Sequence, residues 1–189
     1  MLRHSTFQIA IATLALFLAT AARAQDTAPL RWCAYLTNGS VQKLASDPAA
    51  LEKAPQLLKA LNISKVYLEF FRQTSVSNDD VKKVSGALAQ QGFEVAGGIA
   101  TLPGENYGVR EDAKLGWFNW QAQKTRDDVA KVMSTAAPLF SEIIVDDFFC
   151  TGDMSAESVA AKGELPWGDY RRALMVQAAQ QSIIVPAKS

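Results

Sequence analysis

The chain has 189 residues, 49% of them hydrophobic and 20% charged, with 19 basic and 19 acidic side chains. This length and composition are typical of a single globular domain that can bury a sizeable core. The balanced charge gives no reason to expect nucleic acid or an anionic membrane surface as a partner.

The first residues have the pattern of a Sec signal peptide. Arg3 supplies the positive charge, residues 9–19 form an apolar segment too short to span a bilayer, and an A-x-A cleavage site ends at Ala24. We therefore expect residues 1–24 to be removed, leaving a mature domain over residues 25–189. That domain should be secreted, or periplasmic if the source is Gram-negative, with no membrane attachment after cleavage.

Cleavage would remove the only histidine, His4, together with two arginines, leaving 17 basic against 19 acidic residues and a net charge of about −2. A chain without imidazole cannot build a Ser-His-Asp or Cys-His nucleophile or a histidine-based metal site. There is no clean G-x-G-x-x-G and no Walker motif. We therefore expect no cofactor and no metal site, and an ordered ligand spacing for calcium or magnesium is also missing.

The chain contains two cysteines, Cys33 and Cys150. Export would permit a disulfide. We place one cysteine inside the first strand and the other at the tip of the fourth, and these positions need not meet. A bridge between them is not expected.

From Leu30 onward, the pattern repeats the order strand, loop, helix. Alternation of apolar and polar residues predicts strands, whereas apolar residues at helical spacing behind Ser, Thr or Asp predict helices. The first half is predicted to contain a strand over 31–37 closed by the turn residues Asn38-Gly39-Ser40, a helix from Asp47-Pro48 to about Asn62, a strand over 65–71, a helix opened by Ser77 to Asp80 and ended at Gly92, and a strand over 94–100 containing Gly97-Gly98.

The second half begins with the longest connection, Thr101 to Lys124. Connections of this length are uncommon in compact domains unless they carry function or further structure. The remaining predicted elements are a helix capped by Thr125 to Asp128, a strand over 143–145 that is apolar enough to be buried on both faces, a short helix over 156–162, and a last helix from Tyr170 to about Ile184.

These elements make four βα units, and we predict an α/β fold with parallel strands. Repeated right-handed βαβ crossovers give either a closed (β/α)8 barrel or an open doubly wound sheet. Predicted strands start at about 31, 65, 94 and 141, a barrel-like spacing, but a complete TIM-type barrel typically needs about 250 residues. About half of a TIM-type barrel is therefore the leading prediction, and a small open doubly wound sheet is the alternative.

Half a barrel would expose two sheet edges and an inward face, which folded proteins normally avoid. The sequence leaves three expectations open. The chain is a truncated product, it self-associates through the exposed edges to complete a barrel, or it closes as a small open sheet.

Two adjacent carboxylates, Asp146 and Asp147, stand directly behind the apolar run of the fourth strand. The carboxyl ends of parallel strands face the functional site in α/β folds. A turn usually needs one acid rather than two. This favours a site at the pair, although one acid could cap the turn while the other is solvated.

Glu69 lies near the carboxyl end of the second strand, where alternation places it with Tyr67 and Phe71 on one face. It is a candidate partner for the aspartate pair, because hydrolysis of a glycosidic bond uses two carboxylates that flank it. The alternative is a buried ion pair between Glu69 and Arg72 or a lysine.

Several segments together resemble a known group of proteins. WCAYLT, KVYLEFFR, the Gly-Gly strand, IIVDDFFC and WGDYRRALM are similar to the N-terminal half of uncharacterised bacterial secreted proteins with a glycoside-hydrolase-like (β/α)8 barrel. That resemblance implies a loop rich in cysteines after DDFF and a fifth strand, whereas this loop holds only Cys150 and the sequence stops at Ser189. The Asp-Asp pair also resembles that of O-GlcNAcase-type hexosaminidases, which implies substrate-assisted hydrolysis.

The predicted function is hydrolysis of a glycan by carboxylate chemistry. Asp147 or Asp146 would act as general acid/base, with a pKa raised by the neighbouring charge and by Phe148 and Phe149. Glu69 would be the second carboxylate or orient sugar hydroxyls. Predicted substrate-binding residues are Tyr35, Arg72, Tyr107, Trp117, Trp120 and Trp167.

Each aromatic residue has an alternative role in packing the long connection onto the sheet. The alternative functions are a non-catalytic carbohydrate-binding module and an inactive remnant of a longer enzyme.

Overall fold

The computed structural model describes residues 30–148 and 150–189. Residues Trp32–Ser189 form one compact unit. The predicted signal peptide lies outside the described residues. Within the described ranges, no helix combines the length and the apolar character that crossing a membrane would require.

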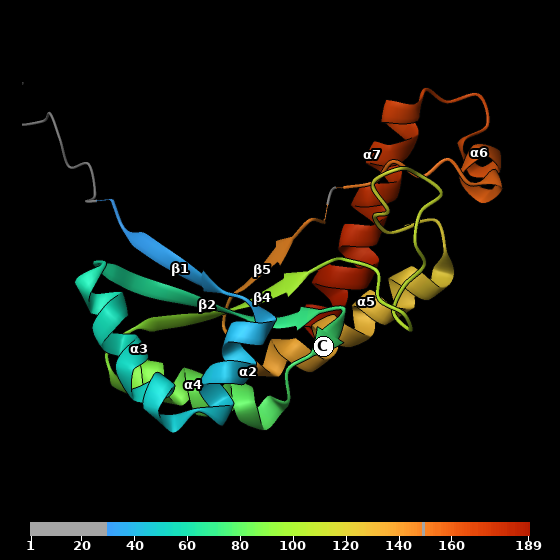
Figure 1. Ribbon diagram of the computed structural model, residues 1–189. Helices are drawn as coiled ribbons and strands as arrows, with labels where there is room; N and C mark the ends of the chain where they lie inside the picture. The colour runs from blue at the N-terminus through green and yellow to red at the C-terminus, as the bar shows by residue number, and fades with distance from the viewer. Residues whose placement is uncertain (1–29, 149) are drawn as a thin grey trace, which may run out of the picture. The chain divides into compact units, whose positions relative to one another are not determined.

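Four parallel strands form the sheet, as predicted (Figure 1). They are β1 (Trp32–Leu36), β2 (Ile63–Arg72), β4 (Glu94–Ala100) and β5 (Ile143–Asp146), and they lie side by side in chain order. A two-residue strand that the sequence did not indicate, β3 (Thr74–Ser75), turns back antiparallel to the end of β2.

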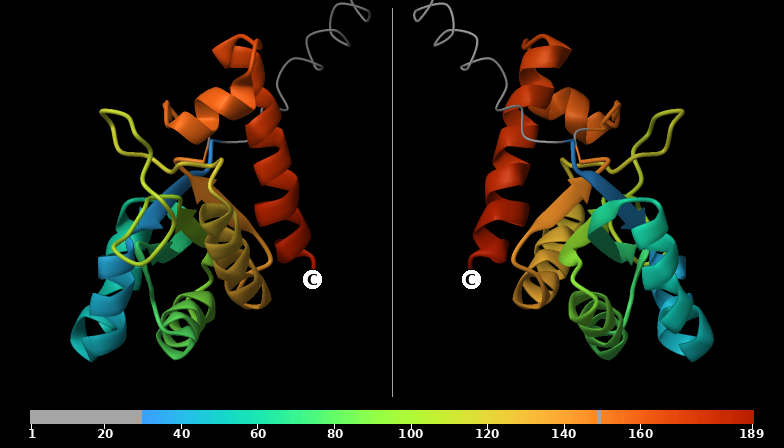
Figure 2. Two further views of the ribbon diagram at one scale, coloured as in Figure 1. Left: turned by 90° about the vertical axis from the view of Figure 1, so that its right-hand side faces the viewer. Right: turned by 90° about the vertical axis from the view of Figure 1, so that its left-hand side faces the viewer.

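Helices α2 to α5 lie on one face of this sheet (Figures 1 and 2). A doubly wound fold needs a reversal of strand order, and the order β1-β2-β4-β5 has none. The arrangement is therefore an open sheet wound in one direction, consistent with a partial barrel. The helical elements are α2 (Asn38–Ser46), α3 (Pro48–Ala60), α4 (Asn78–Gln90), α5 (Gln123–Ala136), η1 (Ala137–Leu139), α6 (Ala156–Lys162), α7 (Trp167–Ala178), η2 (Ala179–Ile184) and α8 (Val185–Ala187).

The core lies between the sheet and these helices. Val66 and Leu68 of β2 are fully buried, as are Val84 and Leu88 of α4 and Val41 of α2. Burial of each such aliphatic side chain contributes about 1.5–3 kcal/mol relative to leaving it exposed. The opposite face of the sheet, turned away from α2 to α5, is called the open face below.

Helix α2 was missed in the sequence, where Asn38-Gly39-Ser40 were assigned to a turn. The Thr37 side chain accepts a hydrogen bond from the Ser40 amide and caps a helix there. The predicted cap of α5 at Thr125 was also wrong. The helix begins at Gln123 without a side-chain cap, so Thr125 lies inside it. Asn119 accepts hydrogen bonds from the Gln121 and Ala122 amides in the turn that precedes the helix.

Strand β5 was expected to be buried on both faces, but it is an edge strand, and Ile144 on its open face is 43% exposed. Its other face is covered, because Ile143 and Val145 line a small cavity together with Ile183 of the C-terminal helical segment. That segment, α7 through α8, packs beside α5 and continues past the predicted end at Ile184. Cys33 and Cys150 both carry free thiols.

Candidate functional site

A buried carboxylate, Glu69, organises the carboxyl end of the sheet on the open face. Its side chain has 0% exposed surface. One oxygen accepts from the Tyr35 hydroxyl at 2.9 Å and the other from the Asn38 amide at 2.7 Å. The Arg72 guanidinium closes the set, with Nε at 3.0 and 3.1 Å and a terminal nitrogen at 2.9 Å. Both oxygens of Glu69 are therefore occupied by protein donors.

The pairing of Glu69 with Arg72 depends on a bulge in β2. Residues three apart on a regular strand point to opposite faces. The register with β4 shifts between Glu69, which lies opposite Gly98, and Phe71, which lies opposite Ile99. The extra residue, Phe70, brings the Arg72 side chain round to Glu69 and ends the alternation that had placed Phe71 beside Glu69.

Tyr35 reaches Glu69 by lying across Gly98 of β4. A Cβ atom at position 98 would stand 2.7 Å from the Tyr35 hydroxyl and 2.8 Å from its ring. Burial, followed by the charge of Glu69 and the hydrogen bond to it, raises the pKa of the Tyr35 phenol. The hydroxyl therefore keeps its proton and remains a donor.

The aspartate pair follows β5 at the same end of the sheet. The Asp147 amide donates to the Asp146 carboxylate at 3.0 Å. The Asp147 backbone has φ 58°, a left-handed conformation that Asp and Asn adopt more readily than other non-glycine residues. Burial and then the neighbouring charge of Asp146 raise the pKa of the Asp147 carboxyl, while Arg72 acts in the opposite direction.

The sheet register places the Asp146–Asp147 pair and the Glu69–Arg72 ion pair on the same surface. Asp146 lies opposite Ala100, which in turn lies opposite Arg72. Two strand spacings separate Asp146 from Arg72, about 10 Å between their Cα atoms. Asp146 contributes to the raised pKa of both Tyr35 and Arg72. The structure thus brings together five of the predicted site residues, namely Tyr35, Glu69, Arg72, Asp146 and Asp147.

Tyr107 and Trp120 lie inside a row of packed rings. The centroids are 4.2 Å apart for Phe71 and Tyr107, 5.6 Å for Tyr107 and Phe118, 5.3 Å for Phe118 and Trp120, and 5.0 Å for Trp120 and Phe148. Trp120 is only 1% exposed. Tyr107 and Trp120 therefore have the packing role that the sequence analysis gave as the alternative to sugar binding.

Trp117 and Trp167 are only partly buried. The Arg171 guanidinium lies 4.7 Å from the centre of the Trp167 ring. Trp167 also packs edge-on against Tyr170, with 5.9 Å between the ring centroids. These two tryptophans therefore keep ring surface that a ligand could contact.

Two buried acids that the sequence did not single out connect the long loops. Glu111 accepts from the Gly152 amide at 2.6 Å. Asp153 accepts from the Asp112 amide at 2.9 Å, from the Ser155 hydroxyl at 2.7 Å and from the Ser158 hydroxyl. These bonds tie the connection after β4 to the loop after β5, so both loops stand over the same end of the sheet.

Asn38 was also missed as a site residue. Its amide binds Glu69, and its side chain donates to the Thr74 carbonyl at 3.0 Å. The available signal was its position directly behind the first strand, at the end where parallel strands present their functional groups. Within the described residues, no group of three or more His, Cys, Asp or Glu side chains is arranged to hold a metal ion.

The two glycines of β4 allow a matched test of the Tyr35 position. Gly98→Ala should displace Tyr35, whereas Gly97→Ala meets Phe140 on the helix-covered face at 2.5 Å. Each should destabilise the protein by about 1–3 kcal/mol through overpacking. Spectrophotometric titration should show a tyrosine pKa falling toward its ordinary value in Gly98→Ala alone. An unchanged titration curve in that variant would contradict the role of Gly98.

The fold and the site together define a class: a singly wound parallel α/β sheet with carboxylates and an arginine at the carboxyl ends of its strands. A family model described as "Probable glycosyl hydrolase, catalytic domain" matches residues 19–189. The chain belongs to this family.

Two further similarities were found. The chain is 26% identical over 177 residues to the uncharacterized protein SSO3021 of Saccharolobus solfataricus, a match that covers 82% of this chain and 30% of that protein. The chain thus spans about a third of the length of this curated relative. A crystal structure of a hypothetical protein from Ruminiclostridium thermocellum superposes with a TM-score of 0.52 and 15% identity, covering 78% of this chain and 91% of that one, and so shares the fold.

Proposed function

We propose that the open face at the carboxyl end of the sheet binds a carbohydrate and hydrolyses its O-glycosidic bond by carboxylate acid/base catalysis. The observation that carries the proposal is the Asp146–Asp147 pair, which stands at the tip of β5 on the sheet that also holds the Glu69–Arg72 ion pair. Family membership supports the reaction class.

Asp147 is assigned as the general acid/base. A general acid at a glycosidic oxygen must hold a proton at working pH, and a raised carboxyl pKa provides it. Burial and Asp146 both act in this direction on Asp147. Asp146, which is more exposed, is assigned as the second carboxylate, free to act on the sugar or on an attacking water.

Glu69 is assigned a positioning role. Its oxygens already accept from Tyr35, Asn38 and Arg72, so it has little capacity left for a nucleophilic or acid role. It fixes the orientation of the Tyr35 ring and of the guanidinium. Arg72, whose side chain is 37% exposed, keeps N–H donors for sugar hydroxyls.

Trp117 and Trp167 are the proposed stacking residues. Aromatic rings offer a flat apolar surface of the kind that packs on a sugar ring. The proposal does not use Tyr107 or Trp120, because neighbouring rings cover them. Export through the N-terminal signal is part of the same proposal, since it would bring the domain to glycans outside the cytoplasm.

A panel of chromogenic aryl glycosides and oligosaccharides tests the reaction. The purified chain should release product from at least one member of the panel, and Asp147→Asn should not. A glycan that raises the melting temperature without being cleaved would instead identify a carbohydrate-binding module.

The pH dependence tests the assignment of Asp147. A general acid loses activity as pH rises through its pKa, and Asp146 raises that pKa. Asp146→Asn should therefore move the basic limb of the kcat/KM profile to lower pH. Glu142→Gln, at the opposite end of β5, is the control and should leave the limb unmoved. A limb that stays in place or rises in Asp146→Asn would remove Asp147 from this role.

A further inference from the structure

Both outer edges of the sheet carry an unpaired strand. Strand β1 pairs only with β2, and β5 pairs only with β4, within the described part of the chain. Such edges are templates for pairing with another strand. Because the strands are parallel and follow chain order, anything that adds to β5 in the same sense and carries its helices outside continues a barrel.

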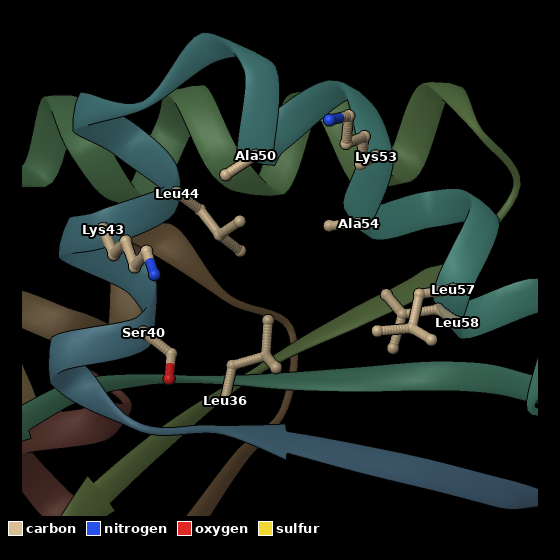
Figure 3. A pocket seen from close by; sticks show the side chains of 9 residues that line it. All are labelled: Leu36, Ser40, Lys43, Leu44, Ala50, Lys53, Ala54, Leu57 and Leu58. Carbon is tan, nitrogen blue, oxygen red and sulfur yellow. The ribbon is translucent and has the colours of Figure 1, made fainter.

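A groove of about 410 Å³ lies between α2 and α3 over Leu36 at the end of β1 (Figure 3). Leu36 of β1, Leu44 of α2 and Ala54, Leu57 and Leu58 of α3 give it an apolar lining. Leu57 is 63% exposed there. In a barrel, helices form an outer ring around the strands. If another strand paired with the free edge of β1, the helix that follows that strand would therefore pack over this groove.

The other edge carries a surface of matching character. The C-terminal helical segment that covers β5 exposes Val176 (59%), Ile184 (37%) and Val185 (62%). Val176 lies in α7, Ile184 ends the π-helical stretch η2, and Val185 begins α8. These three exposed apolar side chains are called the stripe below. Of these, Ile184 lines the cavity beside Ile143 and Val145 of the edge strand β5.

The register selects the occupant. Across the sheet, Leu36 of β1 lies opposite Leu68 of β2, which lies opposite Gly97 of β4. Gly97 in turn lies opposite Ile143 of β5. A ring of eight strands with shear eight advances by about eight residues in a full circuit, hence by about four for each set of four strands. Residues 143–146 would then face residues 32–35 of a second copy, which all belong to β1. A shift in the other direction would pair β5 with the helical residues 40–43.

We propose that two copies of this chain close an eight-stranded ring. In it, β5 of each copy pairs in parallel with β1 of the other, and the stripe of each C-terminal helical segment lies in the groove of the other copy. The two contacts are equivalent by two-fold symmetry, so the assembly closes. The same register places Asp146 of one copy opposite Tyr35 of the other.

This proposal is independent of the proposed hydrolysis, and its test uses mass rather than activity. Light scattering on the purified chain at micromolar concentration should give twice the mass of one chain. Leu57→Glu should raise the dimer Kd roughly a thousandfold, because it acts at two equivalent contacts of about thirtyfold each. Leu61→Glu is the matched control. Leu61 is 59% exposed at the end of the same helix, outside the groove, and the control should remain dimeric.

A second measurement tests the strand pairing. With Cys150→Ser as background, Ile144→Cys should cross-link to the native Cys33 of the other copy through a short bismaleimide, giving a dimer band on a denaturing gel. Adding Cys33→Ser should abolish the band. The mass of a single chain, an unchanged dimer in Leu57→Glu, or no Cys33-dependent band would each overturn the proposal.

Discussion

Replacement of Glu69 by alanine is expected to destabilise the protein by about 3–5 kcal/mol, the usual cost of removing one member of a buried ion pair. In this variant the Arg72 guanidinium, the Tyr35 hydroxyl and the Asn38 amide lose their acceptor, because all three donate to the Glu69 carboxylate. Urea denaturation should show the loss as a lower midpoint with an unchanged slope.

The control for this variant is Glu142→Ala. Glu142 also binds a cation and a tyrosine, at 2.6 Å from Lys65 and 2.8 Å from Tyr67, but its side chain is 50% exposed. Exposed ion pairs contribute little to stability because solvent screens them. Equal losses in the two alanine variants would show that burial does not set the value of the Glu69 network.

Replacement of Asp147 by asparagine should lower kcat/KM by about 10²- to 10⁴-fold, the usual contribution of a general acid/base, and raise stability at neutral pH. The pKa of Asp147 is higher in the folded than in the unfolded chain. Its ionised form therefore costs stability above the folded pKa, and this cost vanishes below the unfolded pKa of about 3.9. Asparagine removes the charge and tolerates φ 58°.

Asp147→Ala separates catalysis from folding. Alanine also removes the carboxyl, so activity should fall as far as in the asparagine variant. It is strained by about 1–2 kcal/mol in the left-handed conformation, so stability should fall rather than rise. Steady-state kinetics and thermal unfolding on both variants, with the remote exposed Asp127→Asn as control, give the comparison. Full activity in either Asp147 variant would contradict the catalytic assignment.

Local sequence signals predicted the four parallel strands and most of the helices. The alternation of apolar and polar residues predicted the bounds of β2 and β4 closely, and the apolar run before Asp146 predicted the position of β5. The same signals missed α2, because the residue types of Thr37-Asn38-Gly39-Ser40 suit a turn as well as a helix cap. Only the contact of the Thr37 side chain with the Ser40 amide distinguishes the two.

Other features depend on neighbours that no local pattern reports. Burial of a strand depends on what lies beside it, so the apolar composition of residues 143–145 could not reveal an edge. The Glu69–Arg72 pair requires the bulge at Phe70, and the segment KVYLEFFR contains no local signal that predicts a bulge. The sequence had nevertheless raised this ion pair as the alternative for Glu69.

The bonds from Gly152 to Glu111 and from Asp112 to Asp153 join two loops that are about 40 residues apart in the sequence. A substitution that breaks either hydrogen bond would therefore loosen both loops, and any redesign has to treat the two loops as one unit. The tip of the connection after β4 carries Leu115, which is 76% exposed. That tip is the natural place to graft a reporter or a library without disturbing the scaffold beneath.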